Sequence, residues 1–126
     1  MTDAIYQFYF EKLHVWQNLR LFTDKIYKIS KTFPVDERYN LTSQIRRAVV
    51  SSLVNLAEGS TRSTKKDQAN FTAISYSSLM EVLSLIIVSY DQQLIDDHIY
   101  ASIRSELNHI ANQLNALKRS QLNQKV

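Results

Sequence analysis

Three basic residues, Arg62, Lys65 and Lys66, follow closely on Gly59, the only glycine of the chain. We expect a helix to begin at about Lys65, so that these cations lie at its N-terminus, where the helix dipole disfavours positive charge by up to about 1 kcal/mol each. Folding then gives little reason for all three residues to be basic. Phosphate contacts give one, because each neutralised phosphate releases a condensed counterion. The three residues are therefore predicted to bind phosphates.

Three glutamates are candidates for acid–base chemistry, because carboxyl groups can serve as general acids and bases. They are Glu37, Glu58 and Glu81. Two buried acids close together can act as a general acid and a general base. The sequence has no phosphate-binding loop, no nucleophile pattern and no metal-ligand set to join them. We expect no enzymatic activity. An enzyme that uses Glu37 or Glu58 is a third alternative, after the two functions described at the end of this section.

The chain has no cysteine and three histidines, His14, His98 and His109. The lack of cysteine excludes disulfides and thiolate chemistry, and it suits a reducing cytoplasm, where we expect the protein to be. Histidines without a carboxylate at helical spacing make a poor metal site, so we expect neither metal nor cofactor. The longest apolar run, Val82 to Val88, is far shorter than the roughly 20 residues of a membrane-spanning helix.

Length and composition favour one helical domain over residues 1–126. A chain of 126 residues with one glycine and one proline has almost no turn signals, which predicts a few long helices around one core. Residues 1–12 are predicted to form an aromatic N-terminal arm, and residues 120–126 a polar basic tail. The arm either packs across a neighbouring surface or extends the first helix along its own bundle.

The segment from Phe33 to Gly59 is predicted to organise the fold. Pro34 suits the first turn of a helix, and Gly59 suits a left-handed residue just after a helix ends. Nothing between them interrupts helical geometry, so we expect one helix of about 24 residues. Its apolar residues lie nearly all round, which predicts a buried helix with the other helices packed around it.

Three further helices are predicted, at about 13–31, at about 65–91 and from Asp96 onward. Thr64 and Asp67 form an approximate capping box for the third helix, and Asp96 caps the fourth. Short connections make consecutive helices antiparallel neighbours. The fold class is therefore all-α, an antiparallel up-down-up-down four-helix bundle.

The third helix is apolar over more of its circumference than one core can cover, since a core-facing stripe needs little more than about 100°. The excess predicts a second buried surface and hence self-association. In the second helix, Asn55 and Glu58 fall on or near the buried face, where polar groups need partners. Arg46, Arg47 or Arg62 of the same or an adjacent subunit are the expected partners, and Glu58 is expected to form a structural salt bridge. The residues predicted to have a structural or oligomer role are Trp16, Asn55, Glu58, Leu79, Leu83 and Ile87.

Charge is unevenly distributed, although the net charge of +3 is too small to indicate a nucleic-acid-binding protein by itself. In an antiparallel bundle, one end collects Lys12, Arg62, Lys65, Lys66, Lys118, Arg119 and Lys125 against Asp3, Glu11, Glu58 and Asp67. The opposite end collects Asp36, Glu37, Asp91, Asp96 and Asp97 against Lys28, Lys31 and Arg38. The candidate nucleic-acid-binding residues are Arg62, Lys65, Lys66, Arg46, Arg47, Lys118 and Arg119.

Five motifs occur in order along the chain. They are Phe10-x-x-Leu13-x-Val15-Trp16-Gln17, Phe33-Pro34-x-x-Glu37, Leu41-x-x-Gln44-Ile45-Arg46-Arg47-Ala48, Asn55-Leu56-Ala57-Glu58-Gly59 and Ser78-Leu79-x-Glu81-Val82. The chain thereby resembles the bacterial four-helix-bundle proteins encoded in intervening sequences of large-subunit ribosomal RNA, which are related to the accessory variability determinant of diversity-generating retroelements. The resemblance implies a helical bundle and a ring-like homopentamer. For the retroelement relatives it also implies a basic surface that binds nucleic acid and a reverse transcriptase.

Two positions depart from that family pattern. Ser52-Leu53 stands where the family commonly has Ile-Pro, which predicts a straighter second helix here. Ser77 stands where the family commonly has glycine, which adds a side chain at a predicted close helix contact.

The sequence therefore predicts a non-enzymatic homo-oligomer that binds RNA or DNA through phosphates, without reading the base sequence. A reverse transcriptase is a further partner implied by the resemblance. The alternative is a protein-interaction scaffold that holds a partner such as a polymerase, with incidental surface charge.

Overall fold

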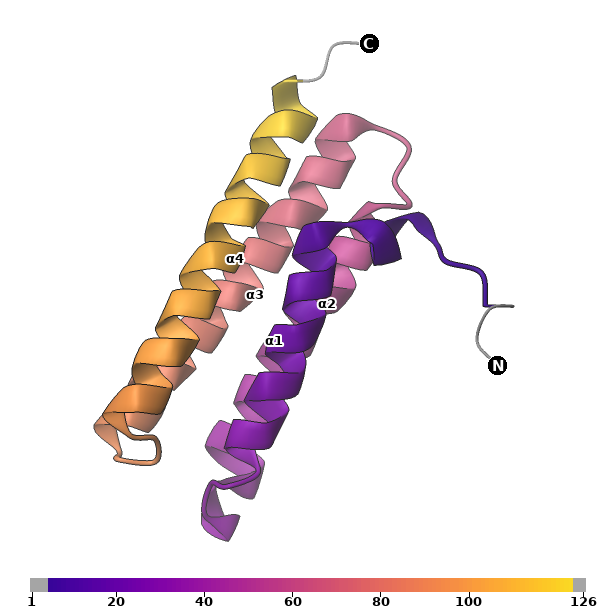
Figure 1. Cartoon of the computed structure of the whole chain (residues 1–126). Helices are drawn as coiled ribbons and strands as arrows, with labels where there is room; N and C mark the ends of the chain where they lie inside the picture. The colour runs from indigo at the N-terminus through magenta and orange to yellow at the C-terminus, as the bar shows by residue number, and fades with distance from the viewer. Residues whose placement is uncertain (1–4, 124–126) are drawn as a thin grey trace.

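The computed structural model describes residues 5–123 (Figure 1). These residues contain four α-helices and no strand, which confirms the all-α prediction. The α-helices are α1 (His14–Ser30), α2 (Ser43–Gly59), α3 (Lys65–Asp91) and α4 (Asp97–Asn123). Three short helical turns precede α1 and α2, namely η1 (Tyr9–Lys12), η2 (Val35–Glu37) and η3 (Arg38–Thr42).

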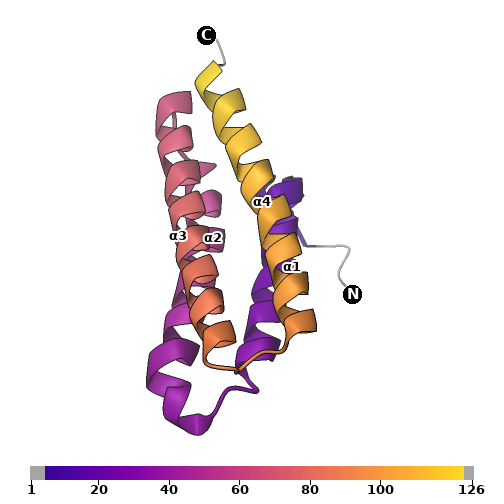
Figure 2. The same cartoon turned by 90° about the vertical axis from the view of Figure 1, so that its left-hand side faces the viewer.

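The four helices lie side by side, and each packs against two neighbours (Figures 1 and 2). Helices α1 and α3 each pack against both α2 and α4. The start of α1, the α2–α3 connection and the end of α4 lie at one end of the bundle, and the other two connections lie at the opposite end. The prediction that the other helices surround α2 is wrong, because α2 leaves Arg47, Val54 and Glu58 exposed.

The second helix also begins later than predicted. Pro34 has an extended backbone (φ −57°, ψ 151°), and residues 35–42 form the 3₁₀ turn η2 and the π-helical turn η3 instead of α-helix. The Glu37 carboxylate accepts hydrogen bonds from the Leu41 N–H (3.5 Å) and the Asn40 side-chain amide (3.2 Å). Such local bonds compete with the α-helical pattern, so the regular helix starts only at Ser43.

Gly59 does not adopt the predicted left-handed conformation, because no described glycine has a positive φ. It is the last residue of α2 and is buried against α3. A Cβ atom at this position would lie 2.7 Å from the Cβ of Phe71. Gly59 is therefore needed because it lets the two backbones approach closely.

The left-handed residue lies at the other end of α3. Gln93 has a φ of 62°, and the Leu94 N–H donates to the Ser89 carbonyl (2.9 Å), which is the Schellman arrangement of a helix C-terminus. Asp96 then caps α4 as predicted, since its carboxylate accepts from the Ile99 N–H (2.8 Å).

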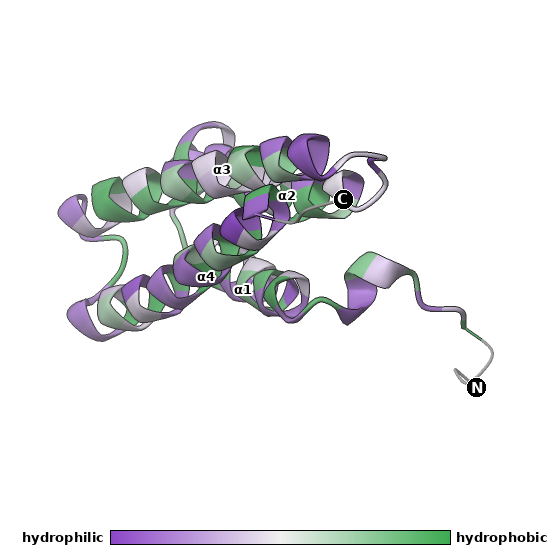
Figure 3. Cartoon of the chain, turned by 90° about the horizontal axis from the view of Figure 1, so that it is seen from above, coloured by the Kyte–Doolittle hydropathy of each residue, from purple (hydrophilic) through white to green (hydrophobic). Residues whose placement is uncertain are grey.

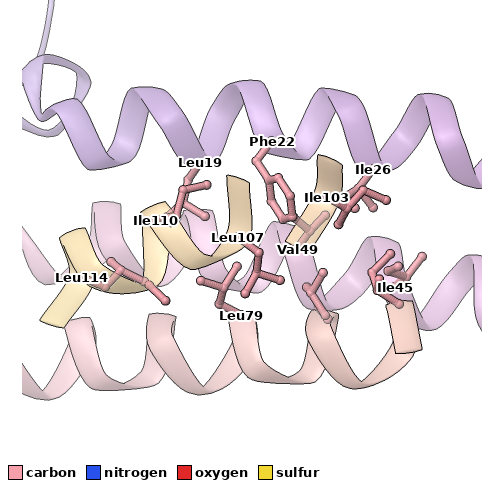
Figure 4. Packing of buried hydrophobic residues seen from close by; sticks show 14 of the residues in the cluster. Leu19, Phe22, Ile26, Ile45, Val49, Leu79, Ile103, Leu107, Ile110 and Leu114 are labelled. Atoms are coloured by element: carbon pink, nitrogen blue, oxygen red, sulfur yellow. The ribbon is translucent and has the colours of Figure 1, made fainter. Parts of the chain in front are cut away.

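The core is formed by apolar side chains from all four helices (Figure 4). Leu19, Phe22 and Ile26 of α1 are fully buried, and they point toward the side chains of α4 and α2. Helix α3 is long and apolar enough to cross a membrane by length and composition alone, and 33% of its apolar 18-residue window is buried inside the fold. Its buried apolar residues are Ala69, Leu79, Val82 and Ile86.

Small polar residues join α2 to α3. The Ser52 hydroxyl donates to the Ser75 carbonyl (2.9 Å), and the Ser75 hydroxyl donates to the Ser52 carbonyl (2.7 Å). Ser51 and Ser78 share a second hydroxyl contact of 2.9 Å. Because both Ser52 and Ser75 are fully buried, these reciprocal bonds satisfy groups that water cannot reach. We call these four residues the serine seam.

Three other expectations differ from the structure or fall partly outside the described residues. Helix α4 continues to Asn123, so residues 120–123 are helical and not a tail, and 124–126 lie outside the described residues. Ser77 is exposed, so it makes no close helix contact within the chain. Of the predicted arm, residues 5–8 are non-helical, η1 follows them, and 1–4 lie outside the described part.

Candidate nucleic-acid interface

The first turn of α3 presents two lysines to solvent. Thr64 caps the helix, since its hydroxyl accepts from the Asp67 N–H (3.1 Å), and this capping fixes where Lys65 and Lys66 emerge. Both lysines are exposed. The hydrophilic first turn of α3 is visible beside the loop from α2 in Figure 3. The helix predicted over residues 65–91 is thus confirmed at the end that carries the candidate site.

Other basic residues are brought to the same end of the bundle. Lys118 and Arg119 lie in the last two turns of α4, and Lys12 ends η1 (Figure 1). Lys125 and Asp3, predicted at this end, lie outside the described residues. We define the basic end as Lys12, Arg62, Lys65, Lys66, Lys118 and Arg119, with Glu11, Glu58 and Asp67 as its described acids.

None of the six cations of the basic end forms an ion pair with another residue of the 5–123 segment. Arg62 nevertheless has a role in the fold. Its guanidinium lies 4.4 Å from the centre of the Phe71 ring, and its carbonyl accepts from the Gln68 side-chain amide (2.9 Å). The expectation that folding gives little reason for all three residues to be basic therefore needs correction for Arg62, whose cation packs on Phe71, and stays a prediction for Lys65 and Lys66.

Arg46 and Arg47 are not brought to the basic end, since they lie near the start of α2, in the opposite half of the bundle (Figure 1). The Arg46 Nε donates to the Ser30 hydroxyl (2.9 Å) and its Nη2 donates to the Tyr27 carbonyl (3.1 Å). Its guanidinium also covers the Tyr27 ring at 4.7 Å. Arg46 thus closes the C-terminus of α1, where a cation suits the helix dipole.

Two of the predicted structural residues behave differently from expectation. Glu58 is exposed and not near the buried face as predicted, and it forms no ion pair within the described chain, so a salt bridge to an adjacent subunit stays a prediction. Asn55 finds its partner in its own helix, where its side-chain amide donates to the Ser51 carbonyl (2.9 Å). Trp16 packs edge to face on Phe10 at 5.0 Å, and its buried Nε1 has no hydrogen-bond partner among the described atoms.

Part of the apolar surface of α3 lies along a groove between α3 and α4. Leu79 is fully buried in the core, whereas Leu83 and Ile87 are half-buried. Leu83 lines a groove of about 710 Å³ together with Tyr76 and Met80 of α3 and with Tyr100 and Arg104 of α4. Sequence analysis did not identify the contribution of α4, because which of its residues face α3 depends on how the two helices pack.

Groups suited to enzyme or metal chemistry are not gathered in one place. Within residues 5–123 no cluster of three or more histidine, aspartate or glutamate side chains is placed to hold a metal ion. The Glu37 carboxylate caps η3 by accepting from the Leu41 N–H, and Glu81 is exposed on α3. At the α3–α4 connection the Tyr90 hydroxyl donates to the Asp97 carboxylate (2.6 Å), and this bond raises the pKa of Tyr90 above its ordinary value near 10.

The fold and its basic end define a small all-helical bundle protein. The chain belongs to the family of 23S rRNA-intervening sequence proteins, whose family model matches residues 11–116, which confirms the family resemblance of the five motifs. The fold is similar to that of a protein of unknown function from the S23 ribosomal protein family of Bacteroides thetaiotaomicron, with a TM-score of 0.76 at 21% sequence identity. The similarity covers 82% of this chain and 97% of that chain. No curated protein matches the sequence.

Proposed function

We propose that this protein is a non-enzymatic, cytoplasmic, homo-oligomeric nucleic-acid-binding protein that contacts phosphates through its basic end without reading base sequence. One observation carries the proposal. Lys65 and Lys66 are exposed at a helix N-terminus, which disfavours cations, and neither forms an ion pair or a side-chain hydrogen bond within the described chain. A ligand that brings negative charge to both is the function that best accounts for them.

The proposed assembly is a ring of up-down-up-down bundles, a pentamer by family resemblance. The α3–α4 groove supports self-association, because it leaves Tyr76, Met80 and Leu83 of α3 partly open to solvent beside Tyr100 of α4. A ring would place several copies of the basic end side by side. The relation to the retroelement variability determinant adds a reverse transcriptase to the partners that we propose.

The test exchanges charge at the basic end while leaving the fold intact. Arg62 is kept, because it packs on Phe71. Lys65→Glu with Lys66→Glu places negative charge at a helix N-terminus, so helicity and melting temperature should hold or rise slightly. Binding of generic RNA or duplex DNA should weaken roughly 100-fold at about 50 mM salt, and the salt slope should fall by about two for each chain that contacts the nucleic acid, since each such chain loses two phosphate contacts. Fluorescence anisotropy over a salt series measures both.

The matched control is Lys31→Glu with Arg38→Glu at the opposite end, where both residues are exposed and unpaired within the described segment. This variant carries the same change in net charge and should bind nearly as the parent does. Equal loss in both variants would mean that only net charge matters. Absence of binding by the parent at low salt would contradict the proposal.

A protein-interaction scaffold is the second candidate function, and the α3–α4 groove favours it. Tyr76, Met80, Leu83 and Tyr100 offer an aromatic and flexible apolar lining of the kind that binds a partner segment. Capture of one protein partner from a nuclease-treated extract, with no nucleic-acid binding by the pure protein, would favour the scaffold.

A further inference from the structure

Residues 5–9 of the N-terminal arm expose large apolar side chains that do not pack into the core. Tyr6 is 74% exposed and Phe8 is 61% exposed, and Ile5 and Tyr9 are similarly open. Burial of an aromatic side chain normally contributes strongly to stability. A run of aromatic side chains left in water therefore indicates a binding role for the arm rather than a core role.

Three contacts restrain residues 6–10 of the arm next to α1. The Phe8 N–H donates to the Glu11 carboxylate (2.8 Å), and the Tyr6 and Phe8 rings meet edge to face at 5.0 Å. Phe10 packs on Trp16 and anchors the arm to the first helix. The exposed rings are thus preorganised, which lowers the entropic cost of binding through them.

A lysine lies beside the last exposed ring of this run, Tyr9. Tyr9 and Lys65 line the same hollow of about 150 Å³, together with Gly59 of α2 and Gln121 of α4. Lys12 belongs to the same helical turn as Tyr9. Figures 1 and 3 show the arm leaving the bundle at the start of α1, which lies at the basic end. Tyr9, the last exposed ring of the arm, and Lys65 of α3 therefore lie on the same surface of the basic end.

We infer that the arm stacks on the bases of single-stranded RNA or DNA whose phosphates lie on Lys65 and Lys66. Exposed aromatic rings beside a basic surface are the combination that binds single strands, because every unpaired base offers a face for stacking. The bases of a duplex are stacked on one another and offer no free face along its length. This inference rests on the proposed function and narrows its ligand to single strands.

The experiment compares labelled 20-nucleotide single strands, oligo-U and oligo-dT, with a duplex of the same length and labels. Tyr6→Ala with Phe8→Ala should weaken binding of both single strands at least about fivefold, which corresponds to the smaller stacking contributions. Duplex affinity and the salt slope should not change, because stacking releases no counterions. Val35→Ala with Tyr39→Ala is the matched control, since these side chains are 75% and 88% exposed at the opposite end. Tyr6→Phe with Phe8→Tyr should bind as the parent does.

Each contrary outcome has a distinct meaning. If single-strand and duplex affinities fall equally, or neither falls, the stacking inference is wrong and the phosphate-contact proposal stands. If the parent binds no nucleic acid, the proposed function fails and the inference with it. Light scattering tests whether the arm instead serves contacts between copies of this chain. The parent protein is expected to have a mass several times 14.7 kDa. A lower mass for the arm variant would assign the arm to contacts between copies and overturn the inference.

Discussion

The two ends of the bundle carry charge for different purposes. At the acidic end, formed by Asp36, Glu37, Asp91, Asp96 and Asp97, the fold uses most of the charge. Asp96 caps the N-terminus of α4, the Asp97 carboxylate accepts from the Tyr90 hydroxyl, and Glu37 caps the N-terminus of η3. At the basic end, Lys65, Lys66 and Arg119 form no side-chain hydrogen bond or ion pair with other residues of the described chain.

The difference separates structural charge from charge that is free to bind a ligand. At the start of α4 the anions agree with the helix dipole, so their position needs no further explanation. At the start of α3 the lysines oppose the dipole, and only Asp67 in that turn agrees with it. A partner outside the chain is the simplest reason for the second arrangement. If the comparison is right, substitutions should affect stability at one end and binding at the other.

The largest effect on stability is expected for Arg46→Ala. The variant removes the hydrogen bonds to Ser30 and to the Tyr27 carbonyl and uncovers the Tyr27 ring. Hydrogen bonds of a charged donor contribute about 2 kcal/mol, so the free energy of unfolding should fall by about that amount. Urea melts followed by circular dichroism measure it. Arg119→Ala is the control and should stay within about 0.5 kcal/mol of the parent. Equal free energies of unfolding for the two variants would contradict the claim that charge supports the fold at one end of the bundle and not at the other.

A smaller loss is expected for Gly59→Ala, which tests how the basic end is held together. The new methyl group would meet the Cβ of Phe71, so the backbone of α3 must shift. Overpacking costs about 1–3 kcal/mol, and the better helix propensity of alanine offsets up to about 1 kcal/mol. We expect a net loss of about 1 kcal/mol in the same urea melts. A variant more stable than the parent would show that α2 and α3 are not in close contact there.

The smallest change, of opposite sign, is expected for Gln93→Gly. A left-handed backbone costs a residue with a Cβ atom about 1 kcal/mol relative to glycine, and Gln93 has a φ of 62°. Glycine should therefore stabilise the protein by up to about 1 kcal/mol, seen as a higher melting temperature. Gln92→Gly is the control, since its φ of −81° gives glycine no such advantage. A destabilised Gln93→Gly variant would contradict the Schellman geometry.

Much of the fold could be predicted because its signals are local. The cap at Thr64 and the apolar period of α3 defined that helix at both ends, and Asp96 marked the start of α4. The start of α2 could not be predicted from Pro34, because the order of residue types does not show that the Glu37 carboxylate accepts from the Leu41 N–H and the Asn40 amide. Gly59 was misinterpreted for a similar reason, since its closeness to Phe71 is a contact between helices.

The candidate site was predictable only in part. Lys65 and Lys66 stood out because they oppose a dipole that the sequence alone indicates. The roles of Arg46 and Arg62 depend on rings and carbonyls of other segments, which no spacing rule identifies. The arm was noticed as aromatic, but only the structure places Tyr9 beside Lys65.

The serine seam has a consequence for the axial register of the bundle. An apolar interface tolerates sliding by one turn, about 5.4 Å, because one leucine replaces another. The reciprocal bonds of Ser52 and Ser75 do not, since sliding would leave two buried hydroxyls without partners. The seam therefore fixes how far α3 projects beyond the end of α2. That projection sets the height at which Lys65 and Lys66 stand relative to Tyr9 and the end of α4.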